Sequence, residues 1–149
     1  MTPLDARLER APCGYAAFAN DMILTAANAT LHEMLGYSPG ELTGRPFGSL
    51  LTVSSRAVFQ IYFQPLIKLN HKVEEMFLNL RMKSGQDFPV LLNASRMETE
   101  EGDMNECILF PMRRIIEYEK QIGASEQAAE KARAELLRLR NQVERVRGS

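Results

Sequence analysis

The sequence predicts an α+β protein in which helices cover one face of a five-stranded antiparallel sheet, followed by a long C-terminal helix. Up to residue 113, Gly and Pro separate short apolar runs. The apolar residues recur first at every second position, as in a strand, then at helical spacing, and then at every second position again. After Arg114 the chain has no Pro and is dense in Ala, Glu, Leu and Arg, which is typical of one continuous helix. We therefore expect a short helix or flexible segment over residues 1–10, a folded domain over 11–113 and a helix over 114–149.

The first expected elements are a short helix and a β-hairpin. Thr2, followed three residues later by Asp5, resembles a capping box and favours a helix at the start of the chain. Apolar runs over residues 14–19 and 22–27 flank Asn20-Asp21, residue types that tolerate a tight turn. This arrangement predicts a hairpin.

Two helix-start signals follow the hairpin. Asn28 stands where an N-cap is needed before residues 29–35, and Gly36 can end that helix in the left-handed conformation. Residues 38–41 place Ser as a cap, Pro at the first helical position and Glu at the third. We expect a second helix start there, with helical turns in quick succession after it.

The main amphipathic helix is expected over residues 54–69. Its apolar side chains recur at three-and-four spacing: Val58, Phe59, Tyr62, Phe63, Leu66 and Leu69. Pro65 is expected to kink this helix or to begin a new turn.

The period then changes to two, which predicts strands. The alternating apolar positions of the first of these strands are Met76, Leu78, Leu80 and Met82. A turn over residues 83–86 leads into a strand over 87–97, and an acidic loop over 98–103 leads into a last strand over 105–112.

The C-terminal segment carries a sustained heptad repeat. Position a holds Ile115, Ile122, Ala129, Leu136 and Val143, and position d holds Tyr118, Ser125, Ala132, Leu139 and Val146. In a parallel pair, Arg114 would face Glu119 and Glu135 would face Arg140, so the pattern predicts a parallel homodimer whose seam is weakest near Gly123. The alternative is a single amphipathic helix that folds back on its own sheet.

Composition and charge exclude several classes of protein. The 149 residues include 18 Lys plus Arg and 19 Asp plus Glu, a net charge of −1, so no basic field attracts nucleic acid. The longest apolar stretches are far shorter than the roughly 20 residues that cross a bilayer, and residues 1–10 lack the apolar centre of a secretory signal. We expect a cytoplasmic protein that binds neither nucleic acid nor membrane.

Three stretches, in order, carry a family resemblance: residues 11–47, residues 73–96 and Cys107-Ile-Leu-Phe110. The most specific run leads from Asn28 through Leu35-Gly36-Tyr37-Ser38 to Glu41-Leu42 and Gly44. Together they resemble the PAS sensor domain over residues 11–113. Residues 62–96 look particularly like PAS domains found ahead of bacterial serine phosphatases and histidine kinases.

The resemblance implies a five-stranded sheet that cups a small pocket, used to hold a cofactor or metabolite, to dimerise, or both. The residues themselves predict an apolar cup on which six side chains converge: Phe59, Tyr62, Phe63, Met76, Leu78 and Leu80. Whether these side chains line a pocket or only fill each other's space stays open. With no Trp and eight Met, the interior suits a flexible apolar ligand such as a fatty acid and equally suits an irregular core.

Two cofactors of the family, a flavin that forms a thiol adduct and haem, are not expected here. The flavin-binding light sensors need a reactive Cys in the helix that residues 45–50 would form, and no Cys is present there. Haem-binding members take a His from the long helix, and residues 54–69 contain none. His71 lies just beyond that helix and His32 lies beside Glu33, so both are expected to be solvated rather than metal ligands.

No catalytic or metal-binding constellation is predicted. Ser54-Ser55 has no placed His partner, and no Gly-rich phosphate loop is present. Cys13 and Cys107 have neither zinc nor disulfide-framework spacing and are expected to be free thiols. If the PAS strand order holds, they lie near opposite ends of two paired strands, which disfavours a disulfide.

The expected function is that of a sensory and dimerisation module of a bacterial signal-transduction protein. It would pass a ligand- or partner-dependent change through the C-terminal coiled coil to an output domain or partner protein, such as a histidine kinase or serine phosphatase. The alternative is a ligand-free PAS scaffold that binds another protein through its outer sheet face or its helix. One departure from the family is Pro111-Met112-Arg113, which replaces the Asp-x-Thr that often joins sheet to helix.

Overall fold

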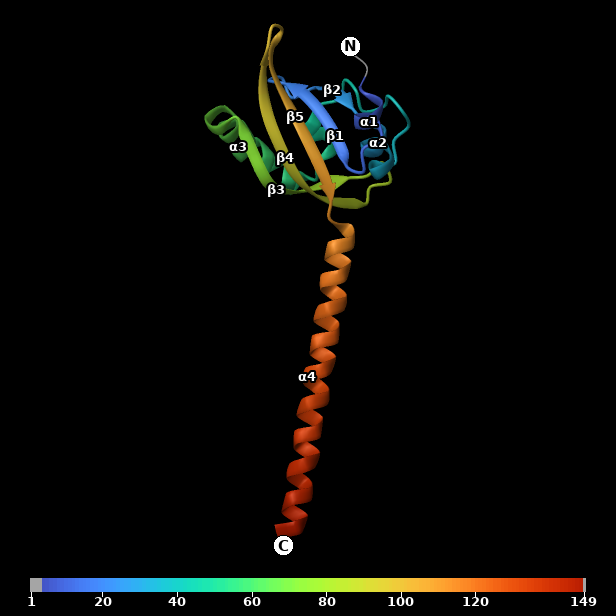
Figure 1. The fold of residues 1–149 in the computed structure, drawn as a ribbon, viewed down its shortest axis with the longest axis vertical. Helices are drawn as coiled ribbons and strands as arrows, with labels where there is room; N and C mark the ends of the chain where they lie inside the picture. Colours follow the sequence, from blue (N-terminus) through green and yellow to red (C-terminus); the bar gives the residue numbers. More distant parts are fainter. Residues whose placement is uncertain (1–3, 149) are drawn as a thin grey trace. The chain divides into compact units, whose positions relative to one another are not determined.

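The computed structural model describes residues 4–148 and contains a five-stranded antiparallel sheet with the strand order β2-β1-β5-β4-β3 (Figure 1). The strands are β1 (Gly14–Ala19), β2 (Leu24–Ala27), β3 (Lys72–Arg81), β4 (Asp87–Thr99) and β5 (Gly102–Pro111). The helices are α1 (Ala6–Glu9), α2 (Ala29–Leu35), the 3-10 helix η1 (Phe47–Leu50), α3 (Val53–Asn70) and α4 (Arg113–Gly148). The predicted α+β class is confirmed. The chain divides into two units after Arg113, and each is described by itself.

Helix α2 has the predicted bounds because both of its caps work as expected. The Asn28 side chain accepts a hydrogen bond from the Leu31 backbone N–H at 2.9 Å, and Gly36 ends the helix with a φ of 78°. The preceding hairpin differs slightly from prediction. Met22 has a φ of 64° and the Asp21 side chain accepts from the Ile23 N–H at 3.0 Å, so the turn is longer and β2 begins at Leu24.

Helix α1 begins later than predicted. Thr2 lies outside the described residues, and Asp5 is the N-cap, with its side chain accepting from the Arg7 N–H at 2.8 Å. The expected helix start at residues 38–41 is wrong. The Ser38 and Glu41 pair exchanges two hydrogen bonds of 3.1 Å, but these close a single turn that Gly40, at a φ of 82°, does not continue.

Helix α3 runs through Pro65 as one helix and faces the sheet with a narrower stripe than predicted. Its buried residues recur at every fourth position: Ser55, Phe59, Phe63 and Ile67. Val58, Tyr62 and Leu69, which were expected on the same face, are exposed. Their side chains lie beside the buried row, because only this row of α3 packs against the sheet and the helix surfaces on either side of it do not.

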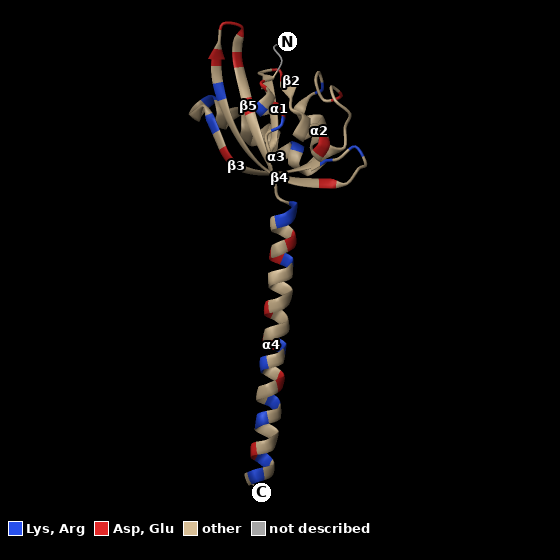
Figure 2. Cartoon of the chain, turned by 45° about the vertical axis from the view of Figure 1, so that its right-hand side comes forward, with Lys and Arg blue, Asp and Glu red and all other residues tan. Residues whose placement is uncertain are grey.

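Strand β3 begins four residues before the predicted alternation and contains a β-bulge. Val73 pairs with Ala94 and Met76 pairs with Leu92, so Glu74 and Glu75 together oppose one residue of β4. The predicted acidic loop over residues 98–103 is largely a continuation of the β4–β5 hairpin, whose tip carries acidic residues (Figure 2).

The core between helices and sheet is built on four aromatic rings that contact one another. Phe18 lies 5.3 Å from Phe47 and 5.6 Å from Phe63, and Phe59 lies 4.5 Å from Phe63, measured between ring centroids. All four side chains are at most 3% exposed. The interior of the cup is therefore occupied by side chains of η1, α3 and β1.

Helix α4 is continuous from Arg113 to Gly148. The Arg138 Nη2 and Glu135 Oε1 atoms lie 2.5 Å apart, and the Arg140 Nε and Glu144 Oε1 atoms lie 3.7 Å apart. Two residues expected to pair across a dimer are thus paired within the single helix. Among residues 4–148, no helix combines the length and apolar character that a membrane crossing requires.

Candidate functional site

The six predicted pocket residues divide into two groups. Phe59, Phe63, Leu78 and Leu80 are buried in the core, whereas Met76 is half-buried and Tyr62 is 55% exposed. Tyr62 therefore does not point into the cup. It lies on the flank of α3, at an opening between this helix and β3.

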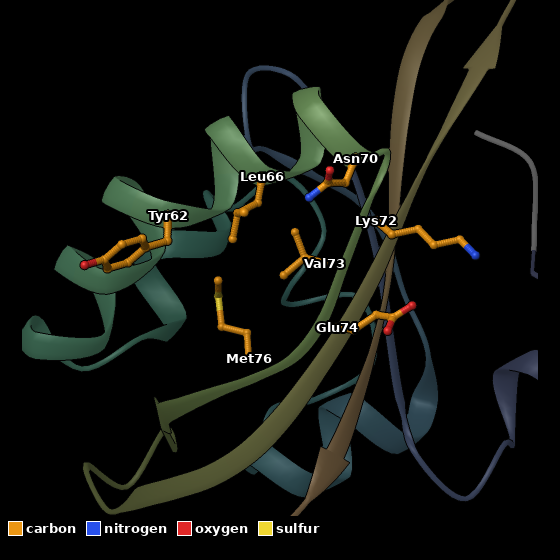
Figure 3. Close-up of a pocket in the computed structure, with 7 residues that line it drawn as sticks. All are labelled: Tyr62, Leu66, Asn70, Lys72, Val73, Glu74 and Met76. Carbon is orange, nitrogen blue, oxygen red and sulfur yellow. The ribbon is translucent and has the colours of Figure 1, made fainter.

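That opening is a groove of about 520 Å³ between α3 and the edge strand β3 (Figure 3). Its lining residues are Tyr62, Leu66, Asn70, Lys72, Val73, Glu74 and Met76. Leu66 points from α3 toward Val73 and Met76 of β3, while Lys72 and Glu74 point away from the groove (Figure 3). The groove thus has an apolar floor and a polar rim, an arrangement suited to the apolar part of a small molecule.

The bulge in β3 creates this apolar floor. In a regular strand, side chains alternate between faces, so Val73 and Met76 would point to opposite sides. Because the bulge adds one residue, both point toward the groove and Glu75 is exposed at the strand edge. Sequence reasoning placed Met76 on the inner face and missed the extension of the strand to Lys72.

A polar cluster lies on the other flank of α3. Arg96, whose side chain is 6% exposed, donates from Nη2 to Asn20 Oδ1 at 2.6 Å and from Nε to Asn105 Oδ1 at 3.1 Å. Gln64 Nε2 donates to the Asn20 carbonyl at 3.5 Å. Within the described residues, Asn105 Nδ2 and Gln64 Oε1 are buried without a hydrogen-bond partner. One buried donor and one buried acceptor of this cluster therefore lack a hydrogen-bond partner.

His32 is not the solvated surface residue that was predicted. It is 5% exposed, and its Nδ1 atom lies 2.8 Å from the Asn28 carbonyl oxygen. The Leu42 backbone N–H donates to His32 Nε2 at 3.4 Å, which leaves Nδ1 as the ring nitrogen that donates to the Asn28 carbonyl. His32 therefore joins α2 to the segment that follows it. His71, at the C-terminal end of α3, is exposed as expected.

Both cysteines are free thiols, but their relative placement differs from the prediction. The prediction placed Cys13 and Cys107 near opposite ends of two paired strands. In the structure, Cys107 lies in the middle of β5, where it pairs with Ala16 of β1. Burial raises the pKa of the Cys107 thiol, which keeps it protonated and inert.

The face of the sheet opposite α3 carries features that sequence reasoning missed. Phe77 and Phe110 are 49% and 51% exposed, and Ile108 is 37% exposed. Beside them, the Tyr15 hydroxyl donates to Glu106 Oε1 at 2.6 Å, and burial followed by this hydrogen bond raises the pKa of Tyr15. The sequence of β5 contained a signal for this exposed apolar face, because apolar residues occupy outward-facing as well as inward-facing positions of the strand.

The predicted coiled-coil residues lie on α4. Its exposed large apolar side chains at heptad positions are Ile115, Tyr118, Ile122, Leu136, Leu139, Val143 and Val146. The smaller Ala129 and Ala132 occupy the middle of the same stripe. Leu137 is also 58% exposed but lies outside the predicted seam.

Comparison with protein families gives a match to the PAS domain over residues 12–110. The chain therefore belongs to the PAS domain family, and the resemblance found in the sequence is confirmed. PAS domains are sensory rather than catalytic, and the matched region makes up most of this chain.

Comparison with individual proteins gives a bacterial phosphoserine phosphatase. The phosphoserine phosphatase RsbP of Bacillus subtilis (strain 168) is 36% identical over 119 residues, which are 80% of this chain. The chain spans 30% of the length of that protein.

Solved structures agree on the fold. A PAS domain from a two-component sensor histidine kinase superposes with a TM-score of 0.60 at 14% identity, over 69% of this chain and 87% of that one. The Rhodobacter sphaeroides LOV protein superposes with a TM-score of 0.63 at 18% identity, over 73% of this chain and 64% of that one. The PAS domain of an HTR-like protein from Haloarcula marismortui superposes with a TM-score of 0.57 at 17% identity, over 71% of this chain and 86% of that one.

Proposed function

We propose that this chain is the cytoplasmic sensory and dimerisation module of a bacterial signalling protein. It passes a ligand- or partner-dependent change through a parallel α4 coiled coil to an output domain. The observation that carries the proposal is the heptad stripe of α4, which begins only two residues after α4 itself begins at Arg113. A phosphatase is the output suggested by the relative RsbP.

Met112 and Arg113, the last residues of the first unit, contact the start of β4. The Arg113 guanidinium lies 5.1 Å from the ring centroid of Phe88, a core residue that is 6% exposed. The Met112 N–H donates to the Pro89 carbonyl at 3.0 Å. A change in core packing that moves the start of β4 would therefore move the start of the coiled coil, and a few kcal/mol of differential ligand binding shifts such an equilibrium.

The α3–β3 groove is the proposed entry for a ligand. Its floor of Leu66, Val73 and Met76 favours an apolar small molecule, and no family cofactor is needed for this proposal. The filled cup favours a second candidate function, in which the chain is a ligand-free scaffold for another protein.

Native mass spectrometry of the freshly purified chain separates these functions. A dimer with additional bound mass supports the ligand sensor. A dimer of bare chains, unchanged after incubation with medium-chain fatty acids, supports the scaffold. A monomer contradicts the proposed dimerisation module.

A further inference from the structure

The helical wall of the α3–β3 groove is a row of residues beside the buried row of α3. Tyr62, Leu66 and Asn70 are spaced four residues apart, so their side chains lie on one side of the helix. At the rise of an α-helix, the row from Tyr62 to Asn70 is about 12 Å long. The groove is therefore elongated, with an aromatic ring at one end of the row and an amide at the other.

The amide of Asn70 is available to a ligand. Its side chain is exposed, and its nitrogen points toward the interior of the groove (Figure 3). Among residues 4–148 this side chain makes no hydrogen bond, so the amide can donate to a ligand in place of solvent. The charged lining residues Lys72 and Glu74 point away from the groove (Figure 3). An uncharged donor therefore marks the polar end of an apolar groove.

We propose that the α3–β3 groove binds an acyl compound whose carbonyl oxygen accepts a hydrogen bond from Asn70 Nδ2. The aliphatic chain of this ligand lies on the floor formed by Leu66, Val73 and Met76. The inference rests on the proposed ligand-sensing function and names the ligand class of the same groove. It makes Asn70 the residue that selects the head group of the ligand.

The floor of the groove fits an aliphatic chain. Leu66 and Met76 pack against the core but remain partly exposed. A chain that covers them removes this apolar surface from water, which is favourable. Met76 has three rotatable bonds and a polarizable thioether, so it can adapt to an unbranched chain.

Binding in this groove does not require the aromatic core to open. Phe59 and Phe63 belong to the neighbouring, buried row of α3. The chain instead contacts β3 on both sides of its bulge, at Val73 and Met76. A bound acyl compound would therefore link α3 to the edge strand while the core rings keep their packing.

Saturation-transfer difference NMR of the full chain tests the head-group contact. Decanamide and decanoate both carry the carbonyl acceptor, whereas protonated decylamine has a head that donates and cannot accept. We expect the two carbonyl compounds to bind more tightly than decylamine. Binding of decanamide alone indicates a neutral acyl ligand, and binding of both indicates that a fatty acid is accepted; either result supports the carbonyl contact.

Asn70→Asp should reverse this preference, because it replaces the amide donor with a carboxylate that can only accept. We expect the dissociation constant of decanamide to rise by up to about tenfold and that of decylamine to fall. Leu66→Gln, in the floor, should weaken the binding of all three ligands. Ile61→Gln, 63% exposed on α3 and outside the lining of the groove, is the matched control and should leave all three unchanged.

The outcomes that overturn the inference differ from those that overturn the proposed function. Equal affinities of the parent chain and Asn70→Asp for each ligand contradict the head-group contact, and binding that Leu66→Gln does not change contradicts the groove as the site. A dimer that binds none of the three ligands overturns the acyl class and leaves the dimerisation module intact, whereas a monomer contradicts that module. Circular dichroism of each variant confirms that lost binding does not reflect an unfolded domain.

Discussion

The backbone N–H of Glu75 donates a hydrogen bond of 2.7 Å to Asn93 Oδ1, the side chain of the single residue that faces the two bulged residues of β3. Glu75 holds a φ of 56°, a conformation that costs a residue with a Cβ about 1–2 kcal/mol. The Asn93 side chain offsets part of this cost by satisfying a backbone donor at the exposed edge of the sheet.

Glu75→Gly should therefore stabilise the domain. Gly adopts the left-handed region freely but has a larger unfolded-state entropy, so we expect a net gain of up to about 1 kcal/mol in the free energy of unfolding. Urea denaturation of the variant and the parent chain measures this change in the free energy of unfolding. Glu74→Gly, in the same bulge but without a positive φ, is the control and should destabilise.

His32→Ala should destabilise the domain. The change leaves the Leu42 N–H and the Asn28 carbonyl without their side-chain partner inside the fold, a loss of about 1–3 kcal/mol. The neighbouring Glu33→Ala removes an exposed side chain of the same helix and should change the unfolding midpoint little. Equal effects of the two variants would contradict the structural role of His32.

Leu139→Asp should abolish the dimer, because it places a charge in the apolar seam of α4. Leu137→Asp introduces the same charge two residues away at a position outside the seam, where the side chain is exposed. Sedimentation velocity should report a monomer for the first variant and a dimer for the second. Loss of the dimer in both would mean that the heptad assignment is wrong.

Tyr62→Trp should report ligand binding in the α3–β3 groove, since the chain contains no other Trp. Titration with decanoate should shift its emission to shorter wavelength as the groove becomes apolar. Ile61→Trp, on the solvent side of the same helix turn, should not respond. Identical responses would indicate nonspecific binding.

Stability should decrease in alkaline solution through Tyr15. Its folded-state pKa is raised above the unfolded value of about 10, first by burial and then by the hydrogen bond to Glu106. The stabilisation is complete below that unfolded value and is lost as the pH rises above it. Tyr15→Phe should make urea denaturation less dependent on pH in this range.

The features predicted correctly from sequence depend on local signals. Asn28 and Gly36 determine the ends of α2 by their own hydrogen bonds and backbone preferences, and the two-residue alternation from Met76 onward identifies β3. The errors concern residues whose surroundings come from distant segments. His32 is buried by a loop ten residues away, and Tyr62 is exposed because only one row of α3 reaches the sheet.

The candidate groove could not be predicted for the same reason. The groove depends on one inserted residue in β3. Glu75 has a positive φ, but neither Glu74 nor Glu75 is a Gly or Asn, the residue types that indicate a left-handed backbone conformation in a sequence. The exposed apolar residues Phe77, Ile108 and Phe110 were missed because an apolar residue in a strand is first assigned to the core.

In the proposed ligand sensor, the four packed phenylalanines of the cup would influence the sensitivity. A molecule that enters the cup must first displace rings that contact one another at 4.5–6.3 Å, and every 1.4 kcal/mol of that rearrangement raises the apparent dissociation constant about tenfold. In the proposed sensor, the packing of Phe59 and Phe63 would therefore influence the detection threshold. We expect smaller side chains at these positions to lower the ligand concentration at which the signal switches.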